Sequence, residues 1–174
     1  MNLQDLKNIS IEDLTVQNLY ETIFLVRSIF HYEKPFRAPF LFTLSVLPKW
    51  MKKIVFPFLK VEQLEFMVLV DNKDKKIIGT TGLFRMKDDP IDIQWLGWFC
   101  VSKHEEGCGF GKKMLNFTIE KAKEKNARVL KLFTSDLDYE RRAQYLYEKL
   151  GFEVVGKGLD EDNMMLLYRE KLLR

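Results

Sequence analysis

The chain has 174 residues, of which 47% are hydrophobic and 30% are charged, a mixture typical of a globular protein. At this length we expect one domain, residues 1–174, whose core needs neither disulfides nor a structural metal. The formal net charge of +3 is too small to indicate a nucleic-acid partner, because such proteins usually concentrate basic residues on one face.

The first part of the chain predicts a strand, a helix and then interrupted helical structure. Ile9 and Ile11 alternate with polar residues, which indicates a short strand. Thr15 is placed to cap a helix whose apolar residues recur at helical spacing: Leu19, Ile23, Val26 and Phe30.

From residue 31 to 63, prolines interrupt every long helical pattern. The segment is also rich in aromatic residues: Tyr32, Phe36, Phe40, Phe42, Trp50, Phe56 and Phe58. Because a solvated loop rarely carries so many, we expect one or two short helices that cover part of the core. The alternatives are a wall of a substrate cleft or an association surface.

The middle of the chain predicts an antiparallel meander. Residues 64–70 and 76–86 are strand-like runs joined by the polar turn 71–75, and a third strand, 91–101, follows the turn 87–90. Next come a helix with Leu115, Ile119 and Ala122 on one face and a strand at 129–133. Since a helical crossover joins them, the strands at 91–101 and 129–133 should be parallel.

The last part predicts a helix at 139–150, ended by Gly151, and a closing pair of strands at 152–156 and 164–168. The expected fold class is therefore mixed α/β (α+β), with a mostly antiparallel twisted sheet flanked by helices and one parallel junction.

The cysteines, Cys100 and Cys108, have neither the spacing of a disulfide framework nor that of a zinc site. The first ten residues lack the basic start and apolar middle of a signal peptide, and no apolar run approaches the ~20 residues of a membrane helix. We therefore expect a cytoplasmic protein with reduced thiols, no metal site and no membrane span.

The stretch EEGCGFGKKML, residues 105–115, places three glycines between a strand and a helix. The first N–H groups of a helix lack internal partners and carry partial positive charge, so this junction predicts an anion site. Spacing excludes a P-loop, because Glu106 stands where its first glycine belongs. It also excludes a dinucleotide fingerprint, which needs glycine in place of Lys112 or Met114. A tight turn without a ligand is the alternative.

Residues 142–152 read RAQYLYEKLGF. With the glycine loop, this motif makes the chain resemble the GNAT superfamily of acetyltransferases, which pair an (Arg/Gln)-x-x-Gly-x-(Gly/Ala) loop with a later Ala-x-x-Leu-Tyr-x-x-x-Gly-Phe helix. The matching residues are Gly109 and Gly111 in the loop, and Ala143, Leu146, Tyr147, Gly151 and Phe152 in the helix. The order of elements also agrees from Ile9 to Tyr168.

The resemblance implies a GNAT-like fold and a site for acetyl-CoA. Backbone groups of Phe99, Cys100 and Val101 would line the pantetheine arm. The pyrophosphate would lie against the backbone N–H groups of Gly107, Cys108, Gly109, Phe110, Gly111 and Lys112. Glu140 stands where relatives often carry an asparagine that contacts the cofactor. Glu106 replaces the usual Arg or Gln, and we expect it to face solvent and weaken binding only modestly.

The resemblance also places Tyr147 where the family has its general acid. A phenol with pKa ~10 is protonated at neutral pH and can donate to a departing thiolate; a core tyrosine is the alternative. Ser135 occupies a position at which some relatives carry the general base, and Asp136, Asp138 and Glu140 lie close by in the sequence.

The implied activity is transfer of an acetyl group from acetyl-CoA to a primary amine, by direct attack in a ternary complex. The amine would belong to a small molecule, a peptide N-terminus or a lysine. A non-catalytic acyl-CoA-binding or sensing module is one alternative. An interaction protein built on the aromatic segment is another, and that segment also leaves a homodimer open.

Overall fold

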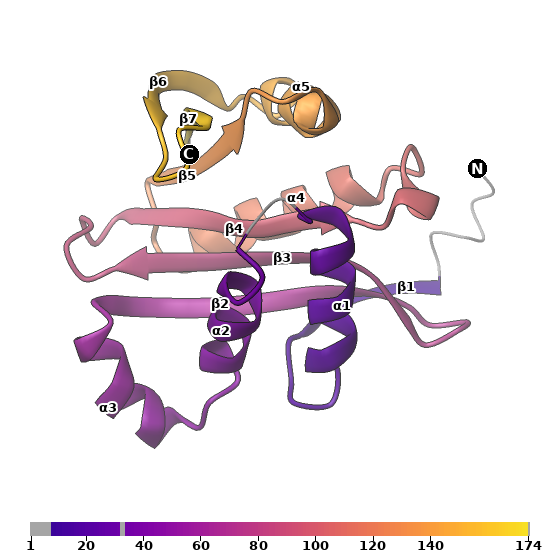
Figure 1. Ribbon diagram of the computed structural model, residues 1–174, viewed down its shortest axis with the longest axis horizontal. Coiled ribbons are helices and arrows are strands. Elements are labelled where there is room, and N and C mark those ends of the chain that lie inside the picture. The colour runs from indigo at the N-terminus through magenta and orange to yellow at the C-terminus, as the bar shows by residue number, and fades with distance from the viewer. Residues whose placement is uncertain (1–7, 32–33, 174) are drawn as a thin grey trace.

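The computed structural model describes residues 8–31 and 34–173. The strands of the described chain form one seven-stranded sheet in the order β1-β2-β3-β4-β5-β7-β6 (Figure 1). In chain order the elements are β1 (Ile9–Asp13), α1 (Leu19–Ile29), α2 (Arg37–Ser45), α3 (Lys49–Phe58), β2 (Val61–Asp71), β3 (Lys76–Met86), β4 (Ile93–Val101), η2 (Lys103–Glu105), α4 (Phe110–Glu124), β5 (Val129–Ser135), η3 (Asp138–Glu140), α5 (Arg141–Lys149), β6 (Glu153–Leu159) and β7 (Met165–Leu172).

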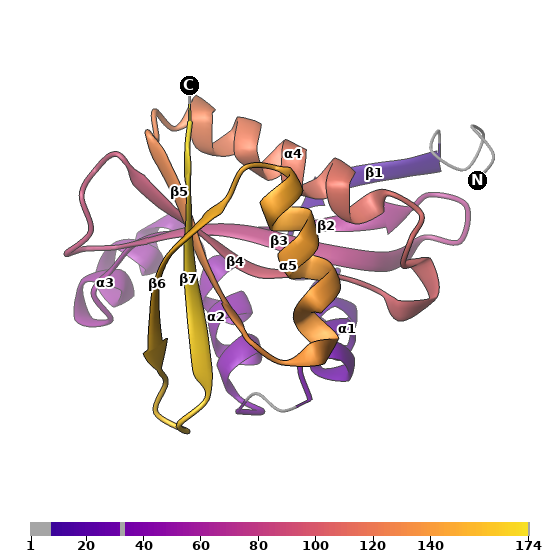
Figure 2. The same cartoon turned by 90° about the horizontal axis from the view of Figure 1, so that it is seen from above.

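Helices cover both faces of the sheet. Figure 2 shows α4 on one face, with α1 and α2 on the other. Val26, Phe42 and Phe56 pack with β2 on the α1–α2 face. Leu115 of α4 and Tyr147 of α5 belong to a second apolar cluster, which includes residues of β3, β4 and β5. The elements around the glycine loop are therefore held by a packed core of their own.

The predicted topology is confirmed. β2, β3 and β4 form the antiparallel meander, and β5 pairs with β4 in parallel. The closing strands also pair with each other, and β7 lies between β5 and β6 rather than at the edge. This order gives β5 a full antiparallel partner on the side away from β4.

The predicted cap at Thr15 is wrong. Helix α1 begins at Leu19, four residues later. Its N-cap residue is Asn18, whose side chain makes no hydrogen bond to the helix. Instead, the Asn18 side chain accepts the Thr15 N–H at 2.7 Å and donates to the Asp13 carbonyl at 3.2 Å. These bonds close the turn between β1 and α1, so an asparagine stabilises the turn and not the helix end.

The aromatic segment forms the short helices α2 and α3, as predicted. Phe42 and Phe56 are buried in the core, but other aromatic residues are exposed: Phe36, Phe40, Trp50 and Phe58. Tyr32, the first aromatic residue of the segment, lies outside the described residues. Nowhere in residues 8–31 or 34–173 is a helix both long and apolar enough to cross a membrane.

The parallel junction is short, and the two strands separate beyond it. β4 and β5 pair only from Ile93–Val129 to Trp95–Lys131, and both views show β5 running away from β4. β5 continues against β7 up to Ser135, while β4 continues against β3. The backbones of β4 and β5 therefore diverge along β4 toward the glycine loop.

Candidate active site

The glycine loop ends at the N-terminus of α4, which no side chain caps. Gly109 is the N-cap residue, directly before the helix, and its φ is +79°. Gly107 has the same φ, in the left-handed region that favours glycine. Because the Lys113 N–H donates to the Gly109 carbonyl at 3.1 Å, the N–H groups of residues 110–112 precede the first bond within the helix. Together with the helix dipole, they form a site suited to an anion.

The first turn of α4 packs closely against β4 and α5. A Cβ atom on Gly111 would lie 3.4 Å from Leu146 Cδ2 and 3.7 Å from Phe99 Cζ, which is ordinary contact. Gly111 thus lies directly beside Leu146 of α5 and Phe99 of β4. The glycine loop, the end of β4 and the helix of the second motif therefore meet at one place.

Beyond the parallel junction, one edge of β4 has no strand partner among the described residues. From Leu96 to Val101, β4 pairs with β3 alone. A bulge interrupts that ladder at Trp98, whose φ is +47°. Trp98 packs on Phe30, the residue after α1, with ring centroids 5.5 Å apart, whereas Phe99 packs toward Tyr147 on the other face. The free edge offers backbone donors and acceptors to an extended ligand, which fits the amide-containing pantetheine arm.

Tyr147 lies beside that edge. It is 4% exposed, with its ring 5.8 Å from Phe99 and 5.7 Å from Phe152. Burial raises the pKa of the phenol above its usual value, and the neighbouring Glu140 and Cys100 raise it further, while Arg169 opposes them. The phenol therefore stays protonated at neutral pH and can only donate a proton. Burial likewise raises the pKa of the Cys100 thiol to about 12, so this thiol is neutral.

Ser135 and Glu140 form the turn that joins β5 to α5. The Ser135 N–H donates to Glu140 Oε2 at 2.9 Å, and the Ser135 carbonyl accepts from Gln144 Nε2 at 2.8 Å. The serine hydroxyl is buried without a hydrogen-bond partner in the described part of the chain. One carboxylate oxygen of Glu140 is thus engaged within the protein. The predicted roles of Ser135 in catalysis and Glu140 in cofactor binding stay predictions.

Glu106 is joined to α5. Arg142 Nη1 donates to Glu106 Oε2, which links the glycine loop to the first turn of that helix. The expectation that Glu106 simply faces solvent missed this pair, because 36 residues separate the partners and only the fold brings them together. Both side chains remain partly exposed, Arg142 at 80% and Glu106 at 39%.

We expect Glu106→Gln to strengthen acetyl-CoA binding by no more than about 5-fold. Exposed ion pairs contribute up to about 1 kcal/mol, and the substitution both removes a negative charge near the loop and releases Arg142. Isothermal titration with acetyl-CoA measures the change. Glu105→Gln is the matched control, since it removes the same charge at the neighbouring position. A gain of 30-fold or more would show that the carboxylate intrudes on the phosphate site.

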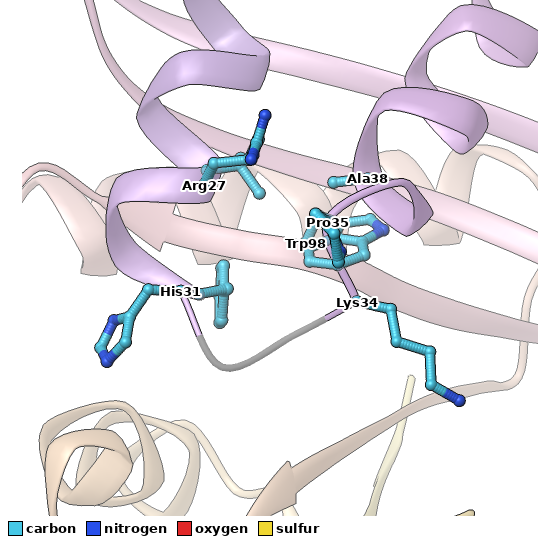
Figure 3. Close-up of a pocket in the computed structure, with 8 residues that line it drawn as sticks. Arg27, His31, Lys34, Pro35, Ala38 and Trp98 are labelled. Atoms are coloured by element: carbon cyan, nitrogen blue, oxygen red, sulfur yellow. The ribbon is translucent and has the colours of Figure 1, made fainter.

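A pocket of about 140 Å³ lies on the other face of β4. Figure 3 shows residues that line it: Arg27 of α1, His31 just after that helix, Lys34 and Pro35 before α2, Ala38 of α2, and Trp98 of β4. Lys34 Nζ pairs with Glu161 at 2.8 Å and Asp162 at 3.6 Å, in the turn between β6 and β7. The pocket therefore lies behind the β4 bulge, and an ion pair ties its wall to the last hairpin.

Comparison with protein families gives one match within the chain. A family model described as an acetyltransferase (GNAT) domain matches residues 62–154. The matched region runs from β2 to the start of β6, so it contains the glycine loop, the separated strands and Tyr147. No curated protein sequence matches the chain.

Solved structures share the fold. A GCN5-related N-acetyltransferase from Kribbella flavida superposes with a TM-score of 0.73 and 17% identity, over 97% of this chain and 99% of that chain. An aminoglycoside 6′-acetyltransferase type Ii superposes with a TM-score of 0.71 and 18% identity, over 95% of this chain and 97% of that chain. A spermidine N-acetyltransferase from Vibrio cholerae, in complex with CoA and spermine, gives 0.68 and 16%, over 96% of each chain.

Proposed function

The chain belongs to the GNAT acetyltransferase family, and on this basis we propose that it transfers an acetyl group from acetyl-CoA to a primary amine by direct attack in a ternary complex. One observation carries the proposal: the uncapped start of α4 and the buried phenol of Tyr147 both lie beside the free edge of β4. An anion site, a backbone edge and a proton donor are what the phosphates, the pantetheine arm and the leaving thiolate of this co-substrate require.

The roles of the residues follow from that arrangement. Backbone N–H groups of residues 107–112 hold the pyrophosphate, and Phe99, Cys100 and Val101 bond the pantetheine arm through their backbone. Acetyl-CoA supplies the thioester that the amine attacks. Tyr147 donates a proton to the thiolate as it departs. Ser135 orients a water molecule that passes the amine proton on to a nearby carboxylate, that of Asp136, Asp138 or Glu140, because neither a hydroxyl nor water is a strong enough base to keep the proton itself.

The acceptor amine approaches from the α1–α2 face. The pocket behind Trp98 supports this route, since it lies across β4 from the glycine loop and Tyr147. The bulge at Trp98 lies in the part of β4 that has no partner on its second edge, between the two sides. Structural neighbours named for spermidine and aminoglycosides make these amines the first candidates, together with peptide N-termini and lysine.

Two measurements test the activity. Titration with acetyl-CoA should give saturable binding, and release of free thiol should accelerate when one amine of a panel is added. The panel holds spermidine, an aminoglycoside, a peptide with a free N-terminus and a lysine peptide. Binding without amine-dependent thiol release would favour the sensing module instead. No binding at all would favour the interaction protein.

We also propose that the whole chain acts as one catalytic domain in the cytoplasm. Both cysteines are free thiols in the structure, which is in keeping with a reducing compartment. A nucleic-acid partner has no part in this proposal.

A further inference from the structure

The outer side of α3 carries an apolar stripe beside a row of lysines. Trp50, Ile54 and Phe58 recur every four residues and are 65%, 57% and 85% exposed. Lys49 and Lys53 are exposed too, and each lies one position before a residue of the stripe, so the two rows run side by side along the helix. We call these five residues the α3 surface. The opposite side of the helix packs into the core through residues such as Phe56.

The α3 surface carries the positive charges of Lys49 and Lys53. Residues 34–60 contain no acidic residue. Two basic residues of this range, Lys34 and Lys60, pair with acidic residues elsewhere in the fold. Among the described residues, neither Lys49 nor Lys53 forms an ion pair. The lysines on the outer side of α4 differ, because Lys121, Lys123 and Lys125 pair with Glu124, Glu120 and Glu65 at 3.4, 2.9 and 2.8 Å.

This combination indicates which partner fits. Exposed lysines without counter-ions favour a polyanion, and the stripe of a tryptophan, an isoleucine and a phenylalanine favours an apolar layer directly beneath that charge. A nucleic acid supplies the phosphates but no apolar layer for Ile54. A second copy of the chain supplies the apolar surface, but α3 against α3 in a symmetric dimer brings the lysine rows together, and like charges repel.

We propose that α3 docks the protein on the surface of an anionic phospholipid bilayer. The lysines contact the headgroups, while Trp50, Ile54 and Phe58 enter the boundary between headgroups and acyl chains. Figure 1 shows α3 at the outer edge of the molecule, beyond β2, whereas the glycine loop and α5 lie on the far side of the sheet. Docking therefore leaves the acetyl-CoA site accessible, and the inference does not depend on the proposed function.

Sedimentation with vesicles tests the proposal. The protein should sediment with phosphatidylcholine vesicles that contain phosphatidylserine, but not with pure phosphatidylcholine vesicles, and added salt should release it. Lys49→Glu with Lys53→Glu should lower the partition coefficient by about 30-fold or more, because each lysine near such a surface contributes roughly 5-fold and reversing the two charges adds repulsion to that loss. The control pair changes the net charge equally at the other end of β2, with Lys73→Glu in the turn between β2 and β3 and Lys76→Glu at the start of β3. This control should bind nearly as well as wild type.

Tryptophan emission provides a second measurement. The emission maximum of Trp50 should shift to shorter wavelength when anionic vesicles are added. Trp50→Phe should abolish that shift while keeping most of the binding. The remaining tryptophans, Trp95 and Trp98, lie in β4 and should not respond.

Three results would overturn the proposal. They are equal binding to neutral and anionic vesicles, an equal loss of binding in the control pair, and a dimer in analytical ultracentrifugation that shields Trp50 from a soluble quencher. Circular dichroism of each variant establishes that the fold is retained.

Discussion

Tyr147→Phe is expected to lower kcat by about 100-fold or more while acetyl-CoA affinity stays within about 2-fold of wild type, since proton transfer from a positioned acid contributes 10²–10⁴-fold. The substitution removes one oxygen from a buried side chain and keeps the ring that packs between Phe99 and Phe152. The fold and the loop should therefore persist, and the loss should fall on the chemical step.

The pH dependence of wild type follows from the same geometry. Burial of Tyr147 favours its neutral form, so its pKa lies above the ordinary value of about 10. The neutral form is the one that donates. Deprotonation of Tyr147 should therefore leave kcat unchanged at every pH below about 10. A change of kcat at a lower pH is assigned to ionisation of the amine or of its base.

Tyr145→Phe is the matched control for this experiment. Tyr145 lies on the same helix two residues earlier, but its side chain is 58% exposed and its ring lies under the Lys149 ammonium at 4.5 Å. Turnover should be unchanged. If Tyr147→Phe also kept full turnover, Tyr147 would be a core residue and another group would protonate the thiolate. A large fall in melting temperature in Tyr147→Phe alone would make the kinetic loss structural.

Much of the scaffold could be predicted from sequence because its signals are local. Alternating apolar runs and polar turns define the meander of β2, β3 and β4. The crossover through α4 dictates the parallel pairing with β5. Gly151, with φ of +79°, ends α5 as its position indicates. Each of these features depends on residues a few positions apart.

The features that sequence missed depend on distant partners or on strain. A tryptophan gives no sign that it will adopt a positive φ, yet Trp98 does so at the bulge of β4. Glu106 and Arg142 meet only because α5 folds back beside the loop. The sequence did not show that Trp50 and Phe58 would be exposed while Phe42 is buried, because a helix packed at a sheet edge buries only one of its sides. Aromatic content alone therefore predicted the helices of this segment but not its surface.

Gly107→Ala with Gly109→Ala is expected to weaken acetyl-CoA binding by roughly 30-fold or more. Both glycines have φ of +79°, where an alanine costs about 1–2 kcal/mol. In the free protein the loop can relax away from this strain. No heavy atom lies within 4 Å of a Cβ on Gly107, and the turn bonds Glu106 N to Lys103 O and Cys108 N to Glu105 O are long, at 3.4 Å each.

In the proposed binding mode the pyrophosphate contacts the loop in its strained conformation, so the cost of the alanines should fall on binding. The dissociation constant and KM for acetyl-CoA should rise, whereas kcat at saturation and the melting temperature should change little. Gly156→Ala is the control: a Cβ there also meets nothing within 4 Å, and its φ lies outside the left-handed region. If the double variant binds acetyl-CoA as tightly as wild type does, the backbone of this loop does not bind the pyrophosphate. The lysine side chains at the start of α4 would then be the next groups to remove.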